Sequence, residues 1–444
     1  MRILHYFLGF PPYRTGGLTK YSMDLMQGQL NRGDNVFALW PGEIKFLRHD
    51  VKIQKNKDVR GIKSYEIVNP LPVPLDEGVS EIGRFIERCS QDIYVHFLKN
   101  IQPDVIHIHT LMGLHKELID AAKLLRIHTV FTTHDFYGIC PKVTLYKDGS
   151  VCDNDHACED CIKCNQTALS NKKIVVMQSP LYRNLKNSFI MKTLRKQHRN
   201  SFFAQEVLEE PVLTEEMRIE RAGAYRRLRE YYLEILSEID LIHFNSGLSE
   251  KVYLRYMSPK KSRIVTISHM DIADKRGATN NVASEMLRIT CLAPAKPYKG
   301  FNVVKEALDH MWDNGFQAFE LKMFGPVSVR SPYMNVRENG YLYEDLQAIF
   351  AETDVLIAAS VSYETFGYTV LEAISYGIPV IISDHVGAQD IIQGAGIIVP
   401  AGSSDAIEKA ILGLTTEKLV ELKAHIIEHC NIKTWSQVID ENYE

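Results

Sequence analysis

The sequence lacks a long apolar run and a strong excess of either charge. No apolar stretch in its 444 residues approaches the roughly 20 residues that a membrane-spanning helix needs. The 51 Lys and Arg stand against 55 Asp and Glu, with a net charge of −4, which gives no overall bias towards nucleic acid. The first residues, MRILHYFLGFPPYRTGG, contain no small-residue cleavage site of the signal-peptide kind. We therefore expect a cytoplasmic globular protein of two or three domains.

Cysteine is sparse outside one stretch. Five of the eight cysteines fall between Cys140 and Cys164. Such local crowding favours a metal or redox cluster in a reducing compartment over disulfides spread through the chain.

The most informative stretch is 354–392. Its pattern predicts a buried strand at 354–360, a helix at 368–376 and a second strand at 380–382. The amide groups at the start of the helix, near Phe366, Gly367, Tyr368 and Thr369, form a predicted anion site.

Two carboxylates flank that anion site. Glu372 follows the helix start by about 7–8 Å at 1.5 Å per residue, the distance from a diphosphate to a ribose, and Glu364 precedes it. A nucleotide sugar would then pass Glu364, the helix start and Glu372 in order. The alternative is a pair of exposed carboxylates in an ordinary βαβ unit.

The pattern S-x3-E-x-FG-x3-LEA-x3-G-x-PV-x3-D-x2-G around these residues resembles the donor site of the retaining glycosyltransferases of family 4. The resemblance implies an α/β protein of GT-B architecture, with two Rossmann-like doubly wound domains facing a cleft. It places Glu364 against the donor sugar and Glu372 against the ribose. The expected domains are an acceptor domain at 1–269 with a cysteine-rich insertion at about 138–168, a donor domain at 270–425, and a terminal helix at 426–444 crossing back.

Further positions match the family in the first domain. Gly16 and Gly17 lie between a predicted strand and helix, where the family has a loop against the donor diphosphate; a plain turn is the alternative. The strand D-V-I-H-I-H ends at His109, on the acceptor side, with both its histidines on one face. His134 and Asp135 end the next strand, and the resemblance places His134 beside the transferred sugar.

The second domain departs from the family at one position. Ala293 stands where relatives often have an Arg facing the diphosphate, whereas Lys299 is retained, in the sequence Lys-Gly-Phe. Lys299 is thus the predicted phosphate cation, and what replaces the missing Arg is open. No metal is expected in the chemistry.

The cysteine stretch contains two overlapping C-x2-C units, which suit a structural zinc and, less well, an iron–sulfur cluster. We favour Cys152, Cys158, Cys161 and Cys164 as ligands, with Cys140 as a competing one. A reduced or disulfide-bonded loop is the alternative.

Residues 171–200 contain eight Lys or Arg and no acid. This patch could lie on an anionic membrane surface or meet a lipid-diphosphate acceptor, or it could be a solvated helix. The family resemblance implies a hexosyltransferase that uses a UDP- or GDP-sugar and a glycan or lipid-linked acceptor, and the basic patch favours a role in surface polysaccharide synthesis. No nucleic acid is expected. The alternatives are a non-catalytic nucleotide-sugar binding or scaffold protein and a cysteine-cluster redox enzyme.

Overall fold

The computed structural model describes residues 1–443 except 46–49, 153–156, 186–187, 189–210 and 278–285. The chain forms two compact units. Unit 1 contains Met1–Asp148, Cys152–Asn245 and Glu250–Val265, and unit 2 contains Gly149–Val151, Ser246–Ser249 and Thr266–Glu444. The sequence placed the boundary after residue 269, and the crossing back of residues 426–444 stays a prediction.

Unit 1 is built on a sheet with the strand order β10-β9-β6-β5-β1-β2-β4-β3, parallel except for the β3–β4 pair. The bounds are β1 (Arg2–Tyr6), β2 (Asn35–Pro41), β3 (Lys52–Lys55), β4 (Lys63–Val68), β5 (Val105–Ile108), β6 (His128–Thr132), β9 (Leu241–Phe244) and β10 (Ser262–Ile264). The central strands are short apolar runs buried on both faces, as expected of parallel sheets. A small pair, β7 (Tyr146–Lys147) and β8 (Ser150–Val151), stands apart from this sheet.

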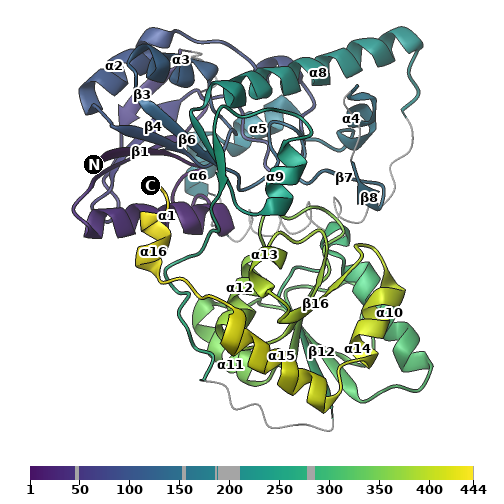
Figure 1. The fold of residues 1–444 in the computed structure, drawn as a ribbon. Helices are drawn as coiled ribbons and strands as arrows, with labels where there is room; N and C mark the ends of the chain where they lie inside the picture. The colour runs from purple at the N-terminus through teal and green to yellow at the C-terminus, as the bar shows by residue number, and fades with distance from the viewer. Residues whose placement is uncertain (46–49, 153–156, 186–187, 189–210, 278–285, 444) are drawn as a thin grey trace. The chain divides into compact units, whose positions relative to one another are not determined.

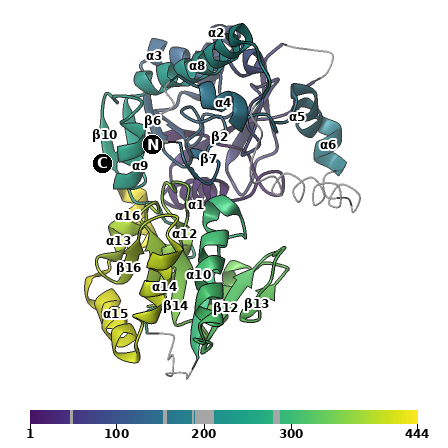
Figure 2. The same cartoon turned by 90° about the vertical axis from the view of Figure 1, so that its right-hand side faces the viewer.

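Helices cover both faces of the unit 1 sheet. In Figures 1 and 2, α2, α3 and α8 lie together on one face and α1 on the other. The helices are α1 (Gly17–Asn31), η1 (Ile82–Phe85), α2 (Gln91–Ile101), α3 (Lys116–Leu124), α4 (Glu159–Cys164), α5 (Asn171–Met177), α6 (Pro180–Leu185) and α8 (Glu215–Glu238). The helix α9 (Gly247–Tyr253) has its first residues in unit 2 and the rest in unit 1. No helix among the described residues has the length and apolar character needed to cross a membrane.

Unit 2 has a fully parallel sheet with the order β13-β12-β11-β14-β15-β16. The strands are β11 (Leu287–Cys291), β12 (Phe319–Phe324), β13 (Met334–Arg337), β14 (Val355–Ala358), β15 (Val380–Ser383) and β16 (Gly396–Val399). The helices are η2 (Pro297–Lys299), α10 (Phe301–Asp313), η3 (Tyr343–Asp345), α11 (Leu346–Ala351), α12 (Tyr368–Ser375), α13 (Gln389–Ile392), α14 (Ser404–Leu412), α15 (Thr416–His429) and α16 (Trp435–Asp440).

Successive side chains on the strands of unit 2 pack into two apolar cores, one on each face of the sheet. Val355 and Ile357 of β14 pack with α10 and α14 in one apolar cluster. Leu356 points to the other face by the two-residue period of a strand, and α12 contacts β14 and β15. This sandwich fixes the start of α12 at the carboxyl end of β14. In an open α/β sheet this edge binds ligands where the strand order reverses, which here is between β11 and β14.

Candidate active site

The loop from β14 to α12 is held by the loop that follows β15. The amide of Glu364 donates to the carbonyl of His385 at 2.9 Å, and the amide of Ala388 donates to the carbonyl of Phe366 at 2.7 Å. Gly367 is the N-cap of α12 and makes no side-chain cap, so the first amides of the helix keep their role as an anion site. Phe366 is buried, whereas Gly367, Tyr368 and Thr369 are partly exposed. The predicted anion site therefore lies at the surface of unit 2.

Glu364 and Lys299 meet beside this helix start. The Lys299 Nζ lies 3.0 Å from the Glu364 Oε1, with side chains 26% and 20% exposed. The Ser360 hydroxyl donates to the same carboxylate. The sequence predicted roles for Lys299 and Glu364. It gave none to Ser360, the first residue of the S-x3-E pattern, which the turn after β14 brings to the carboxylate.

Gly300 positions Lys299. Its φ is +79°, and a Cβ atom there would lie 1.8 Å from the Ala359 carbonyl oxygen. Only glycine permits this approach of the β11–α10 loop to the end of β14. Ala293, at the start of the same loop, packs against the apolar core. The nearby Lys296 donates to the Tyr298 hydroxyl at 2.8 Å.

Glu372 lies on the inner side of α12 and is 1% exposed. His269, also 1% exposed, places its Nε2 3.4 Å from the Glu372 Oε1. Among the described residues the Glu372 Oε2 has no hydrogen-bond partner, which is costly for a buried carboxylate. A carboxylate oxygen in this state can accept hydrogen bonds from the hydroxyl groups of a ligand. No sequence pattern marks His269 as a site residue, because it lies far from Glu372 in the chain and only folding brings the two together.

A cavity of about 500 Å³ adjoins this pair in unit 2. Its lining residues are His269, Asp271, Ile272, Lys275, Leu342, Tyr343, Glu344, Leu346, Glu372, Ser375 and Tyr376. Burial, and to a smaller degree the Glu372 carboxylate, raises the pKa of Tyr341. Leu342, Tyr343 and Glu344, which follow Gly340, line the same cavity as Glu372.

In unit 1 the predicted residues gather at the carboxyl ends of β1, β5 and β6. Gly16 and Gly17 are exposed at the start of α1. His109 is fully buried, and its Nδ1 lies 3.4 Å from the Nε2 of His134. Burial lowers the pKa of His134 to about 3 and raises that of Asp135 to about 6.

The Asp135 carboxylate accepts a hydrogen bond from the Tyr137 amide at 2.8 Å. His107 and His109 stack at 4.2 Å, so the prediction that both share one face is confirmed.

The five cysteines from Cys140 to Cys164 lie in unit 1, and among the described residues they form no closed ligand set. Cys158 and Cys161 are buried, and no disulfide joins the described cysteines. A hydrogen bond with Cys158, followed by burial, raises the pKa of Cys161, and burial raises that of Cys164 to about 12. Thiols fit zinc chemically. Among the described residues, however, the group that holds three metal-binding atoms within 4.8 Å of one another is histidine, not cysteine.

The basic stretch is described only in part, since residues 186–187 and 189–200 lie outside the described residues. Lys172 and Lys173 are exposed on α5. Arg183 instead binds Glu66 at 2.9 Å and lies over the Tyr13 ring, so this member of the stretch is engaged within unit 1.

Comparison with known proteins agrees with this arrangement. Residues 15–150 match the model of "Glycosyltransferase Family 4" and residues 287–417 that of "Glycosyl transferases group 1", together more than half of the chain. A segment is 30% identical over 110 residues to the O-antigen chain mannosyltransferase B of Escherichia coli. That match spans 22% of this chain and 29% of the relative.

Solved structures resemble the whole chain at low identity. The sucrose-phosphate synthase of Thermosynechococcus elongatus matches with a TM-score of 0.55 and 13% identity, over 99% of this chain and 97% of its own. The trehalose 6-phosphate synthase of Burkholderia multivorans matches with 0.57 and 10%, over 99% and 94%. Anabaena HepE, solved with UDP and glucose, matches with 0.52 and 12%, over 99% and 98%. The chain thus belongs to the glycosyltransferases of family 4 and has their GT-B fold of two Rossmann-like domains.

Proposed function

We propose that the protein transfers a sugar from a nucleotide-sugar donor to a saccharide acceptor, and that unit 2 holds the donor. The observation that carries this proposal is the buried Glu372, whose Oε2 has no hydrogen-bond partner among the described residues and which lines a cavity of about 500 Å³. A ribose would supply two hydroxyl donors to this carboxylate. The α12 amides and Lys299 would bind the diphosphate, and Glu364 the sugar.

The transfer would retain the anomeric configuration. In unit 2, Glu364 already engages Lys299 and Ser360, so it serves better to bind hydroxyls than to attack carbon. We favour attack on the face that the leaving group departs from, with a donor phosphate oxygen taking the acceptor proton. Lys299 and the amides after Gly367 would stabilise the charge on the departing diphosphate. Product with inverted configuration in a proton NMR time course would exclude this course.

The acceptor would bind unit 1 near His109, His134 and Asp135. Similarity to an O-antigen chain mannosyltransferase and the exposed Lys172 and Lys173 favour a surface glycan or its lipid-linked precursor. Hexose donors with UDP or GDP are the first to test, since HepE was solved with UDP and glucose.

The test is thermal stabilisation and slow hydrolysis with a panel of UDP-, GDP- and ADP-sugars. It compares the wild type with Glu372→Gln and with Glu428→Gln, a control whose side chain is 76% exposed. One donor should stabilise the wild type and the control and lose its effect in Glu372→Gln. Stabilisation without turnover in any acceptor assay would favour a binding protein, and no response to any donor would refute the proposed function.

A further inference from the structure

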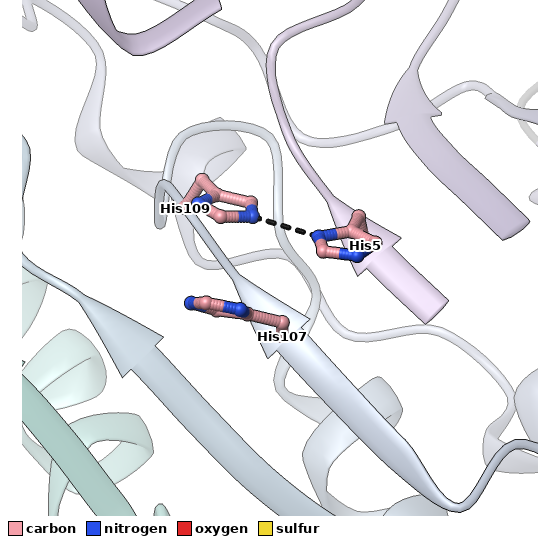
Figure 3. Close-up of side chains that lie close together, drawn as sticks. All are labelled: His5, His107 and His109. Atoms are coloured by element: carbon pink, nitrogen blue, oxygen red, sulfur yellow. Dashed lines mark hydrogen bonds between the residues drawn. The ribbon is translucent and has the colours of Figure 1, made fainter. Parts of the chain in front are cut away.

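A chain of hydrogen bonds links helix α1 to His134 through the interior of unit 1. The Gln29 Oε1 lies 2.7 Å from the His5 Nε2. The His5 Nδ1 lies 2.9 Å from the His109 Nε2, as the dashed line in Figure 3 shows. The His109 Nδ1 lies 3.4 Å from the His134 Nε2.

Each histidine of this chain carries one ring proton near neutral pH. His5 and His109 are fully buried. Burial lowers the pKa of His5 to about 4, that of His134 to about 3, and that of His109 well below its ordinary value. A neutral imidazole has one donor and one acceptor nitrogen, and the partner of one nitrogen decides the character of the other.

The amide oxygen of Gln29 sets the donor-to-acceptor direction of the hydrogen bonds along this chain. An amide oxygen only accepts, so His5 carries its proton on Nε2 and accepts on Nδ1. His109 must then donate from Nε2 and accept on Nδ1. His134 in turn donates from Nε2.

We propose that Gln29, His5 and His109 are positioning residues that hold His134 in the Nε2–H tautomer and make its Nδ1 the hydrogen-bond acceptor. Resting on the proposed function, this tautomer limits the part that His134 can take beside a sugar. An unprotonated nitrogen accepts from a sugar hydroxyl but cannot donate to a carboxylate or a phosphate.

The competing use of these side chains is a metal site. The ligand atoms of His5, His107 and His109 lie within 4.8 Å of one another, and Figure 3 shows their rings grouped across β1 and β5. Both ring nitrogens of His5 and of His109 are nevertheless engaged in hydrogen bonds. The His107 Nε2 pairs with the Thr132 hydroxyl at 2.7 Å. A metal bound by His5 and His109 would have to break the hydrogen bond between them. The proposed chain of hydrogen bonds keeps it.

The direct test is nitrogen NMR on the full-length protein, deuterated and labelled with 15N only in histidine. Long-range proton–nitrogen correlations distinguish a protonated ring nitrogen from an unprotonated one, and His134→Gln identifies the His134 signals. The expected spectrum at pH 7.5 has an unprotonated Nδ1 and a protonated Nε2 for His134. The opposite tautomer in the wild type would overturn the proposal without any further variant.

A matched pair of variants tests whether Gln29 sets the tautomer of His134. Gln29→Met removes the amide oxygen at the start of the hydrogen-bonded chain. Gln27→Met makes the same change elsewhere on α1, where the Gln27 amide donates to the Asn31 Oδ1 at 3.2 Å. We expect Gln29→Met to shift the His134 nitrogens towards a mixture of tautomers and Gln27→Met to leave them unchanged. A purely structural role would lower the stability of Gln29→Met with unchanged His134 signals, which contradicts the proposal.

Two further results separate the alternatives. Stoichiometric metal in the purified protein that is lost in His107→Phe would overturn the hydrogen-bonded chain in favour of a metal site. Because the tautomer is measured without substrate, the expected tautomer together with no response to any nucleotide sugar would refute only the proposed function.

Discussion

Replacing Gly300 by alanine should damage unit 2 through one defined contact. Two costs add at this position. A non-glycine residue at φ of +79° costs roughly 1–2 kcal/mol. The new Cβ atom would also lie 1.8 Å from the Ala359 carbonyl oxygen, and moving backbone to relieve such overpacking costs about 1–3 kcal/mol. We therefore expect a loss of about 2–5 kcal/mol in the free energy of unfolding.

Gly340 supplies the matched control. Its φ is +73°, and a Cβ atom there would meet no heavy atom within 4 Å. Gly340→Ala should therefore pay only the backbone cost of about 1–2 kcal/mol. The difference between the two variants isolates the contact with Ala359.

The assay is urea denaturation of both variants and the wild type, followed by fluorescence. Trp312, packed against the core of unit 2, is one reporter, and a Trp312→Phe background identifies its share of the signal. Thermal melts should agree, at about 2–4 °C per kcal/mol for a unit of this size. Equal losses in the two variants would show that the approach of Gly300 to Ala359 does not constrain the loop.

Three other outcomes can be checked. The free energy of unfolding should fall as the pH drops from 6.5 towards 4, by up to about 1.4 kcal/mol per pH unit for each buried histidine. In this pH range His5, His115 and His134 take up protons in the unfolded chain. In the folded protein burial lowers their pKa values to about 4, 4 and 3, so they stay neutral. Asp135, with its folded pKa raised to about 6, offsets one of them, and urea midpoints that do not change with pH would contradict the sign. Lys299→Met should weaken calorimetric binding of a nucleoside diphosphate sugar at least tenfold and leave the free nucleoside unaffected; an equal loss for both would remove Lys299 from the diphosphate site. If the cysteines hold zinc, purified protein should contain about one equivalent, which Cys161→Ser should lose with a drop in melting temperature, and metal-free wild type of full stability would exclude the site.

Local pattern was enough to predict most of unit 2. The helix predicted at 368–376 is α12 (Tyr368–Ser375) and the strand predicted at 380–382 is β15 (Val380–Ser383), each within one residue of its expected bounds, because each combines a strong period with a clear terminus. The sequence of residues 79–101 predicts one helix over the whole stretch, and this is wrong at the start, since α2 begins at Gln91. The apolar residues before it instead form η1, where the Phe85 carbonyl accepts from the Tyr232 hydroxyl of α8 at 3.1 Å. A contact with a distant helix overrides the local period there.

The site was predictable where a motif marked it. Glu364, Gly367 and Glu372 follow from one stretch of sequence, and the structure places all three around α12. His269 and Gln29 were not predicted, because each acts through a partner far away in the chain: Glu372 for the first, and His5 for the second. Such pairs arise from the register of strands and the packing of helices, which a single sequence does not display.

The two carboxylates of the candidate donor site differ in how they can respond to a ligand. Glu364 and Lys299 form a partly exposed pair, and such pairs contribute only about 0–1 kcal/mol. A donor diphosphate can therefore take Lys299 from Glu364 at little cost and release Glu364 to bind sugar hydroxyls. Glu372 is 1% exposed on the inner side of α12, and its Oε2, which has no hydrogen-bond partner among the described residues, already carries the cost of about 1–3 kcal/mol of an unsatisfied buried group. The ribose would then meet a fixed carboxylate, whereas the diphosphate and sugar would rearrange an ion pair as they bind.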